Sequence, residues 1–289
     1  MFKFKKVIQI YVIFTCFSSS FIGCEDPKSS SGAEALLALG LGGSGYLSSC
    51  DQRTPESGRG IFVADEIVSA PTSTGIGFKD SDCSIDGIRG AGKFNGSLDV
   101  YTLDASGVGS SIILRWSGVK VLPASGIDFI VYENPFFVGV QNNSNSFDNV
   151  FMEPLIVEVG NDLTNWCGWN PTYTNSDPNT FVGNPIYWNK FAGITPFIYN
   201  QDSNPMTVSE VFDTDIINGG GGGDGFDLAD PNFGNSGSGC NSTLKSEIQT
   251  NGFTYIKISA AKTILTSLPI DAAHANPDID GVIAKSVTP

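Results

Sequence analysis

The feature that most constrains the fold is a series of short β-type segments, separated by turn residues, that begins near residue 61. These segments are rich in Val, Ile and aromatic residues and lie at 61–63, 66–68, 98–101, 111–116, 128–132, 155–159 and 253–258. Gly, Pro, Asn, Asp and Ser punctuate them, and no long helical periodicity follows residue 60. The pattern predicts an all-β domain at 61–289, formed as a single jelly-roll-like β-sandwich.

The N-terminus has the pattern of an export signal. Lys3, Lys5 and Lys6 precede a mainly apolar run at 7–17, and small residues lead to Gly23. The apolar run is too short for a membrane-spanning helix, which needs about 20 apolar residues. Residues 1–23 are therefore predicted to be a signal peptide.

Cys24 follows Ser20-Phe21-Ile22-Gly23 directly, and this junction resembles the lipobox of a bacterial lipoprotein, in the relaxed form of spirochaetes. Phe21 stands where Leu is more usual. The resemblance implies that Cys24 is acylated with palmitate-type chains and becomes the mature N-terminus. Such chains contribute about 0.8 kcal/mol per buried methylene, so the protein would be anchored to the envelope, at the outer membrane or cell surface. The alternative is ordinary secretion with an unmodified cysteine.

Residues 24–60 are predicted to be the lipidated terminus and a flexible tether. Ser and Gly dominate 29–32 and 42–45, and such sequences behave as flexible chains. Removing the signal leaves about 266 residues, enough for one large domain or two small ones.

The chain is strongly acidic, with a formal net charge of −14. The three signal lysines leave with residues 1–23, which makes the mature chain more acidic still. Such a charge repels nucleic acid, so DNA and RNA are excluded as partners. It is compatible with cation binding.

Four cysteines remain after Cys16 is removed with the signal and Cys24 is assigned to the lipid: Cys50, Cys83, Cys167 and Cys240. In an oxidising compartment they predict two structural disulfides, with three pairings open. We favour Cys50–Cys83 and Cys167–Cys240, because each pair would close one neighbourhood of the chain.

Several ordered motifs resemble a family of bacterial cell-surface proteins, also described as sorting-signal proteins, whose members are predicted to be secreted β-sandwiches. The motifs lie at 64–69, 96–103, 109–114, 128–136, 151–159, 191–196, 223–229 and 276–282. The resemblance covers roughly residues 60–285 and implies the fold more than an activity, since the family has no settled function. The four cysteines and the N-terminal lipid site depart from the family pattern.

Acidic residues in turn-rich sequence are candidate calcium ligands, because calcium takes six to eight oxygens from flexible loops. Asp224 and Asp227 follow the glycine run 219–223, which is itself predicted to be a mobile loop. Asp278 and Asp280 alternate on a predicted strand and would point the same way. Glu133 is a further oxygen donor. The alternative is that these residues only cap turns.

Aromatic residues in loop-like sequence, most of them in the weakly patterned stretch 168–215, are candidate carbohydrate ligands, since sugar faces stack on exposed rings. They are Trp166, Trp169, Tyr173, Tyr187 and Trp188. Packing at the ends of the domain is the alternative for most of them.

These observations favour a non-enzymatic surface lipoprotein that binds a glycan or a host matrix protein through end loops, with calcium as a stabilising ion. One alternative is a carbohydrate-active hydrolase, which needs two carboxylates about 5–10 Å apart. Glu133, Glu153 and Glu158 supply carboxylates, but no spacing singles out a pair. The other is a purely structural envelope protein. The sequence leaves the ligand and the oligomeric state open.

Overall fold

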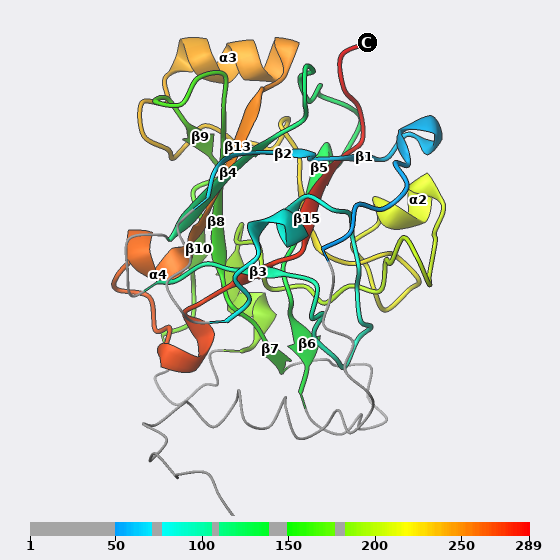
Figure 1. Cartoon of the computed structure of the whole chain (residues 1–289). Helices are drawn as coiled ribbons and strands as arrows, with labels where there is room; N and C mark the ends of the chain where they lie inside the picture. Colours follow the sequence, from blue (N-terminus) through cyan, green and yellow to red (C-terminus); the bar gives the residue numbers. More distant parts are fainter. Residues whose placement is uncertain (1–49, 71–76, 106–109, 139–148, 177–182) are drawn as a thin grey trace, which may run out of the picture. The chain divides into compact units, whose positions relative to one another are not determined.

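Two antiparallel sheets organise the chain in the computed structural model, which describes residues 50–70, 77–105, 110–138, 149–176 and 183–289 (Figure 1). The four-stranded sheet has the order β1 (Phe62–Val63), β15 (Gly281–Ala284), β5 (Phe129–Tyr132) and β12 (Asp224–Phe226). The five-stranded sheet has the order β2 (Glu66–Ser69), β4 (Ser111–Arg115), β13 (Tyr255–Ala260), β8 (Leu155–Gly160) and β9 (Cys167–Gly168).

Three smaller sheets of two strands each complete the β-structure among the described residues. They pair β3 (Tyr101–Thr102) with β14 (Asp278–Ile279), β6 (Phe136–Phe137) with β7 (Val150–Phe151), and β10 (Thr172–Tyr173) with β11 (Trp188–Asn189). Every one of these pairings is antiparallel.

Side chains from the two larger sheets form one shared apolar core. Phe129 and Val131 of β5 lie in the same buried cluster as Ile256 and Ile258 of β13. Side chains alternate between the faces of a strand, so residues spaced by two all reach this cluster. The core is therefore built from the facing sides of both sheets.

The opposite faces of the two sheets differ. Ile130 and Tyr132 of β5 enter a second buried cluster with Phe197 and Tyr199, so the four-stranded sheet is buried on both sides. On the five-stranded sheet, the residues between the core positions of β13 include Lys257, which forms an ion pair of 2.5 Å with Glu158. Part of this face is also covered, because Ile156 of β8 belongs to a third buried cluster.

Within the described ranges, helices are few and short: η1 (Ser57–Arg59), η2 (Ser81–Ser84), η3 (Pro185–Tyr187), α2 (Val208–Val211), α3 (Ser242–Asn251), α4 (Ala261–Ile264) and η4 (Ala272–His274). The sequence reasoning missed α3, the longest of them. The Asn241 side chain caps its N-terminus by accepting from the N–H groups of Thr243 and Leu244. Among the described residues, none of the helices has the length and apolarity required to cross a bilayer.

The prediction of an all-β domain with antiparallel sheets is confirmed. The strands expected at 111–116, 128–132, 155–159 and 253–258 are β4, β5, β8 and β13, displaced by at most a few residues. The strand expected at 98–101 shrinks to Tyr101–Thr102. The sheets are more fragmented than a single regular sandwich.

The glycine run at 219–223 is not the mobile loop that its composition suggested. Gly220 to Gly223 are buried, and Gly222 and Gly223 have φ of +80° and +79°. A Cβ on Gly223 would lie 2.6 Å from the Tyr132 ring, so only glycine allows this segment to approach β5 so closely. The run is a tightly packed connection into β12.

Packing begins before residue 61. Residues 24–49 of the predicted tether lie outside the described residues, but residues 50–60 contact the domain. The side chain of Arg53 is only 6% exposed, and Cys50 is bonded to Cys83. The residues that end the predicted tether are therefore part of the folded structure.

Candidate functional site

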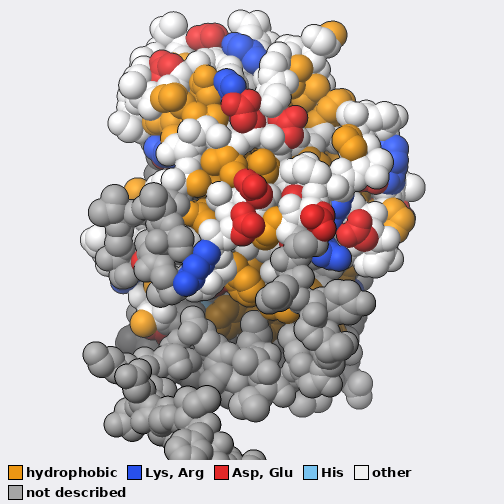
Figure 2. All heavy atoms as spheres, in the orientation of Figure 1, with side chains coloured by type: hydrophobic (Ala, Val, Ile, Leu, Met, Phe, Trp, Pro, Cys, Tyr) orange, Lys and Arg blue, Asp and Glu red, His pale blue; other side chains and the backbone are white. Residues whose placement is uncertain are grey.

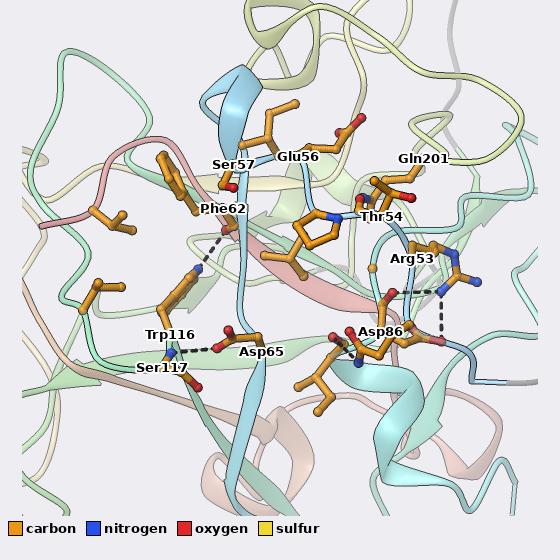
Figure 3. Close-up of a pocket in the computed structure, with 18 residues that line it drawn as sticks. Arg53, Thr54, Glu56, Ser57, Phe62, Asp65, Asp86, Trp116, Ser117 and Gln201 are labelled. Carbon is orange, nitrogen blue, oxygen red and sulfur yellow. Dashed lines mark hydrogen bonds and ion pairs between the residues drawn. The ribbon is translucent and has the colours of Figure 1, made fainter. Parts of the chain in front are cut away.

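A pocket of about 300 Å³ lies between the first described residues and the two larger sheets (Figure 3). One wall is formed by residues 52–57 and by β1. The remaining lining comes from distant segments and includes Asp65, Asp86, Trp116, Ser117 and Gln201. Its volume is at the lower end of the range for small-molecule sites, about 300–1,000 Å³.

Residues 50–57 are held in place by a disulfide and by one arginine. Cys50 and Cys83 are bonded, with their Cα atoms 4.6 Å apart. Arg53 contacts three carboxylates: Asp86 at 2.9 Å, Asp202 at 3.1 Å, and Asp99. Asp86 and Asp99 are buried, so this arginine supplies the positive charge that their burial demands.

Asp86 lies on the pocket lining beside Arg53 and is 2% exposed. Burial raises the pKa of Asp86 to about 7, and the like charge of Asp99 adds to this shift. The Arg53 guanidinium opposes the shift without cancelling it. Asp86 therefore titrates near neutral pH, inside a charged cluster that supports one pocket wall.

Asp280 lies near the same cluster. It is fully buried, and its Oδ1 accepts a hydrogen bond of 3.0 Å from the backbone N–H of Arg89. Burial raises the pKa of Asp280 well above its usual range, and Asp99 and Asp86 raise it further while Arg53 lowers it.

The other wall combines an aromatic ring with polar groups. The indole N–H of Trp116 donates to the carbonyl of Phe62 at 2.8 Å, which fixes the ring against β1. Directly after it, the backbone N–H of Ser117 donates to Asp65 Oδ1 at 2.7 Å. Asp65 is exposed. The Trp116 ring itself is only 3% exposed and packs against Phe253 in the main core, so the groups that a small polar ligand can reach here are the exposed Asp65 and Ser117.

The predicted calcium ligands do not form one group. Asp224 and Asp278 each lie close enough to Glu133 to raise its pKa. Asp280 belongs to the Arg53 cluster instead. Asp227 is partly exposed, and its Oδ1 accepts from the N–H of Ala229 at 2.7 Å, as a turn-capping aspartate does.

The predicted aromatic ligands are largely buried. Trp166, Trp169 and Trp188 are 4%, 1% and 3% exposed. The indole N–H of Trp169 donates to the carbonyl of Asp227, and the ring packs on neighbouring Phe rings of the main core. These tryptophans are packing residues, which corrects their assignment as exposed platforms. Tyr173 and Tyr187 are half-buried, with ring centroids 6.3 Å apart at β10–β11.

Both favoured disulfides, Cys50–Cys83 and Cys167–Cys240, are present. The second joins β9 to the segment just before α3. The proposed lipid site, Cys24, lies outside the described residues.

Sequence reasoning missed the pocket. Arg53 was assigned to the tether, and Asp86 and Trp116 carry no local motif. Their segments are 30 or more residues apart and meet only through tertiary contacts, among them the Cys50–Cys83 disulfide and the Arg53–Asp86 ion pair. One signal could have indicated its position. Arg53 lies three residues after Cys50, and the predicted disulfide of Cys50 anchors the neighbouring residues to the folded domain.

The surface shown in Figure 2 carries acidic side chains across its middle, with apolar side chains between them. This agrees with the net charge of −14. In the comparisons with known proteins, no family model, no curated protein and no solved structure matches this chain.

Proposed function

We propose that this chain is a non-enzymatic surface lipoprotein, retained through acylated Cys24, that binds a small carbohydrate or similar polyhydroxy ligand in the pocket between residues 52–65 and Trp116. The supporting observation is the pocket itself, where the exposed side chains of Thr54, Asp65 and Ser117 offer hydrogen-bonding groups. In this proposal the anchor holds the protein on the bacterial envelope, and the two larger sheets are the layers of a jelly-roll-like sandwich.

Binding is favoured over hydrolysis because the pocket carboxylates serve protein partners. Asp65 accepts from the Ser117 N–H, and Glu56 accepts hydrogen bonds from Arg59 and Tyr199. Asp86 is ion-paired to Arg53. Glu158, considered above for hydrolysis, is paired with Lys257 and is absent from the pocket lining. A hydrolase needs one carboxyl group free to donate a proton and another facing it.

The test is a glycan array probed with the mature lipidated chain in detergent, followed by titration calorimetry on any ligand found. Thr54→Trp places a large side chain at an exposed position of the pocket wall, and Thr243→Trp is the matched control on exposed α3. We expect at least a tenfold loss of affinity for Thr54→Trp and native affinity for Thr243→Trp.

Equal binding by both variants would place the ligand site elsewhere. An array without binding would favour the structural alternative, and release of reducing sugar from a bound glycan would favour the hydrolase. Mass spectrometry of the mature protein tests the anchor, since acylated Cys24 should be its first residue and Cys24→Ala should leave the chain without lipid.

A further inference from the structure

Glu133 follows directly after β5, and it is a carboxylate in an unusual position. It is only 1% exposed. Its Oε1 accepts a hydrogen bond of 3.0 Å from the backbone N–H of Asp278, but its Oε2 is buried without a hydrogen-bond partner. Buried carboxylate oxygens are normally satisfied, so this atom requires an explanation.

The neighbours of Glu133 are acidic. Asp278 in β14 and Asp224 at the start of β12 both act on it, and each raises its pKa beyond the larger effect of burial. Among ion pairs between described residues, none includes Glu133 or Asp224. Negative charge is thus concentrated here without the arginine that the Asp86 cluster has.

We propose that a divalent cation of the calcium type binds at Glu133 Oε2, with Asp224 and Asp278 supplying the surrounding negative charge. The site is separate from the pocket of the proposed function. Its direct ligand is a carboxylate oxygen, and the neighbouring Asp278 accepts a hydrogen bond of 2.5 Å at Oδ1 from the Thr102 hydroxyl. Oxygen donors without thiolate or imidazole select hard cations such as calcium over zinc or copper.

Backbone groups around the proposed cation site orient its side chains. The N–H groups of Ile194 and Thr195 donate to Asp224 Oδ2, at 3.0 and 3.4 Å, which orients that carboxylate. A Cβ placed on Gly193, whose φ is +75°, would lie 2.4 Å from the Glu153 carbonyl oxygen and 3.3 Å from Glu133 Cγ, so the Gly193 backbone passes close to the stem of Glu133.

The geometry also says how the ion would be held. In the described part of the chain, the only group of three Asp, Glu, Cys or His ligand atoms within 4.8 Å of one another is Cys50, Cys83 and Asp99. The disulfide removes both sulfurs of that group as ligands. The acids around Glu133 are more widely spaced, so Glu133 is the direct ligand, and backbone carbonyls and water complete the six to eight oxygens.

The experiment follows thermal unfolding of the mature full-length chain in detergent, with calcium or with a chelator. At one hundred times the dissociation constant, we expect calcium to raise the melting temperature by roughly 5–10 °C. Glu133→Gln keeps the side-chain shape and should abolish the rise. Asp227→Asn, which alters a turn-capping aspartate, is the matched control and should respond as the native chain does.

Titration calorimetry with calcium chloride provides a second readout, and Asp278→Asn should weaken binding at least tenfold even if Glu133→Gln impairs folding. Two results would overturn the proposal. One is a native chain whose melting temperature does not change with calcium in excess. The other is a calcium response that survives in both Glu133→Gln and Asp278→Asn.

Discussion

Two clusters of buried acidic residues in this molecule differ in how their negative charge is compensated. Around Asp86 and Asp99, the Arg53 side chain is buried with the carboxylates and pairs with both. Around Glu133, the neighbouring charges are Asp224 and Asp278, and burial raises the pKa of Asp224 to about 6. In the first cluster, the Arg53 side chain neutralises the negative charge. In the second cluster, only a proton or a cation from solution can neutralise it.

The difference teaches that burial of acidic residues does not by itself identify a binding site. A buried carboxylate with an arginine beside it is part of the folded structure, because removing either partner leaves an uncompensated charge. Buried carboxylate oxygens without a hydrogen-bond partner occur in both clusters, at Asp86 and Asp280 as well as at Glu133, but only the first cluster has the Arg53 cation beside them. Substitutions in the two clusters should therefore have opposite consequences.

The largest effect is expected from Arg53→Met, which removes the counter-charge of the first cluster. Methionine keeps much of the apolar stem but leaves Asp86 without its cation and Asp99 with only the half-exposed Arg89, 3.6 Å away. We expect the free energy of unfolding at pH 7 to fall by about 3–5 kcal/mol, measured by urea denaturation. Arg59→Met is the control, since Arg59 is 42% exposed and should lose about 1 kcal/mol or less. Equal losses in the two variants would contradict the assigned role of Arg53.

The sharpest contrast is between Asp99→Asn and Glu133→Gln, measured without calcium at pH 8. Asp99→Asn weakens a buried ion pair with Arg53 and should destabilise the protein by about 1–3 kcal/mol. Glu133→Gln removes a buried charge with an unpartnered oxygen and should stabilise it by about 1–3 kcal/mol. Shifts of the same sign would show that the two clusters do not differ in charge compensation.

Much of the architecture could be predicted because its signals are local. The β-branched runs at 111–116, 128–132 and 253–258 became β4, β5 and β13. Helix α3 escaped prediction because it has little apolar periodicity, with Ile248 its only buried residue. Its signal was instead the Asn241 cap and Gly252 after its last residue, with φ of +77°.

The candidate sites were harder to predict because they depend on tertiary contacts. Composition placed Trp169 among loop aromatics, yet three Phe rings surround it in the main core. Asp278 and Asp280 alternate on one segment, as expected, but Asp278 lies by Glu133 and Asp280 near Arg53. Which side chains an acidic residue contacts depends on strand pairing. Local sequence patterns do not reveal that pairing.

The smallest effect concerns pH, and its sign follows from the raised pKa of Asp86. Burial, aided by Asp99, lifts this pKa from its ordinary value to about 7 in the folded state. Between these two values the folded protein binds more protons than the unfolded chain, so stability is greatest at acidic pH and falls as pH rises through 7. Asp86→Asn removes this contribution, and we expect it to reduce the loss of stability between pH 5 and pH 8 by on the order of 1 kcal/mol.

Urea unfolding of the native and Asp86→Asn chains at pH 5 and pH 8 measures this slope. The buried acids Glu133 and Asp280 also have raised pKa values, so the variant should keep a shallower slope of the same sign. If Asp86→Asn left the slope unchanged, Asp86 would be ionised throughout this range and Arg53 would compensate it fully. The proton dependence would then arise from Glu133, where the neighbouring acids raise the pKa, and from Asp280, whose burial outweighs the lowering effect of Arg53 on its pKa.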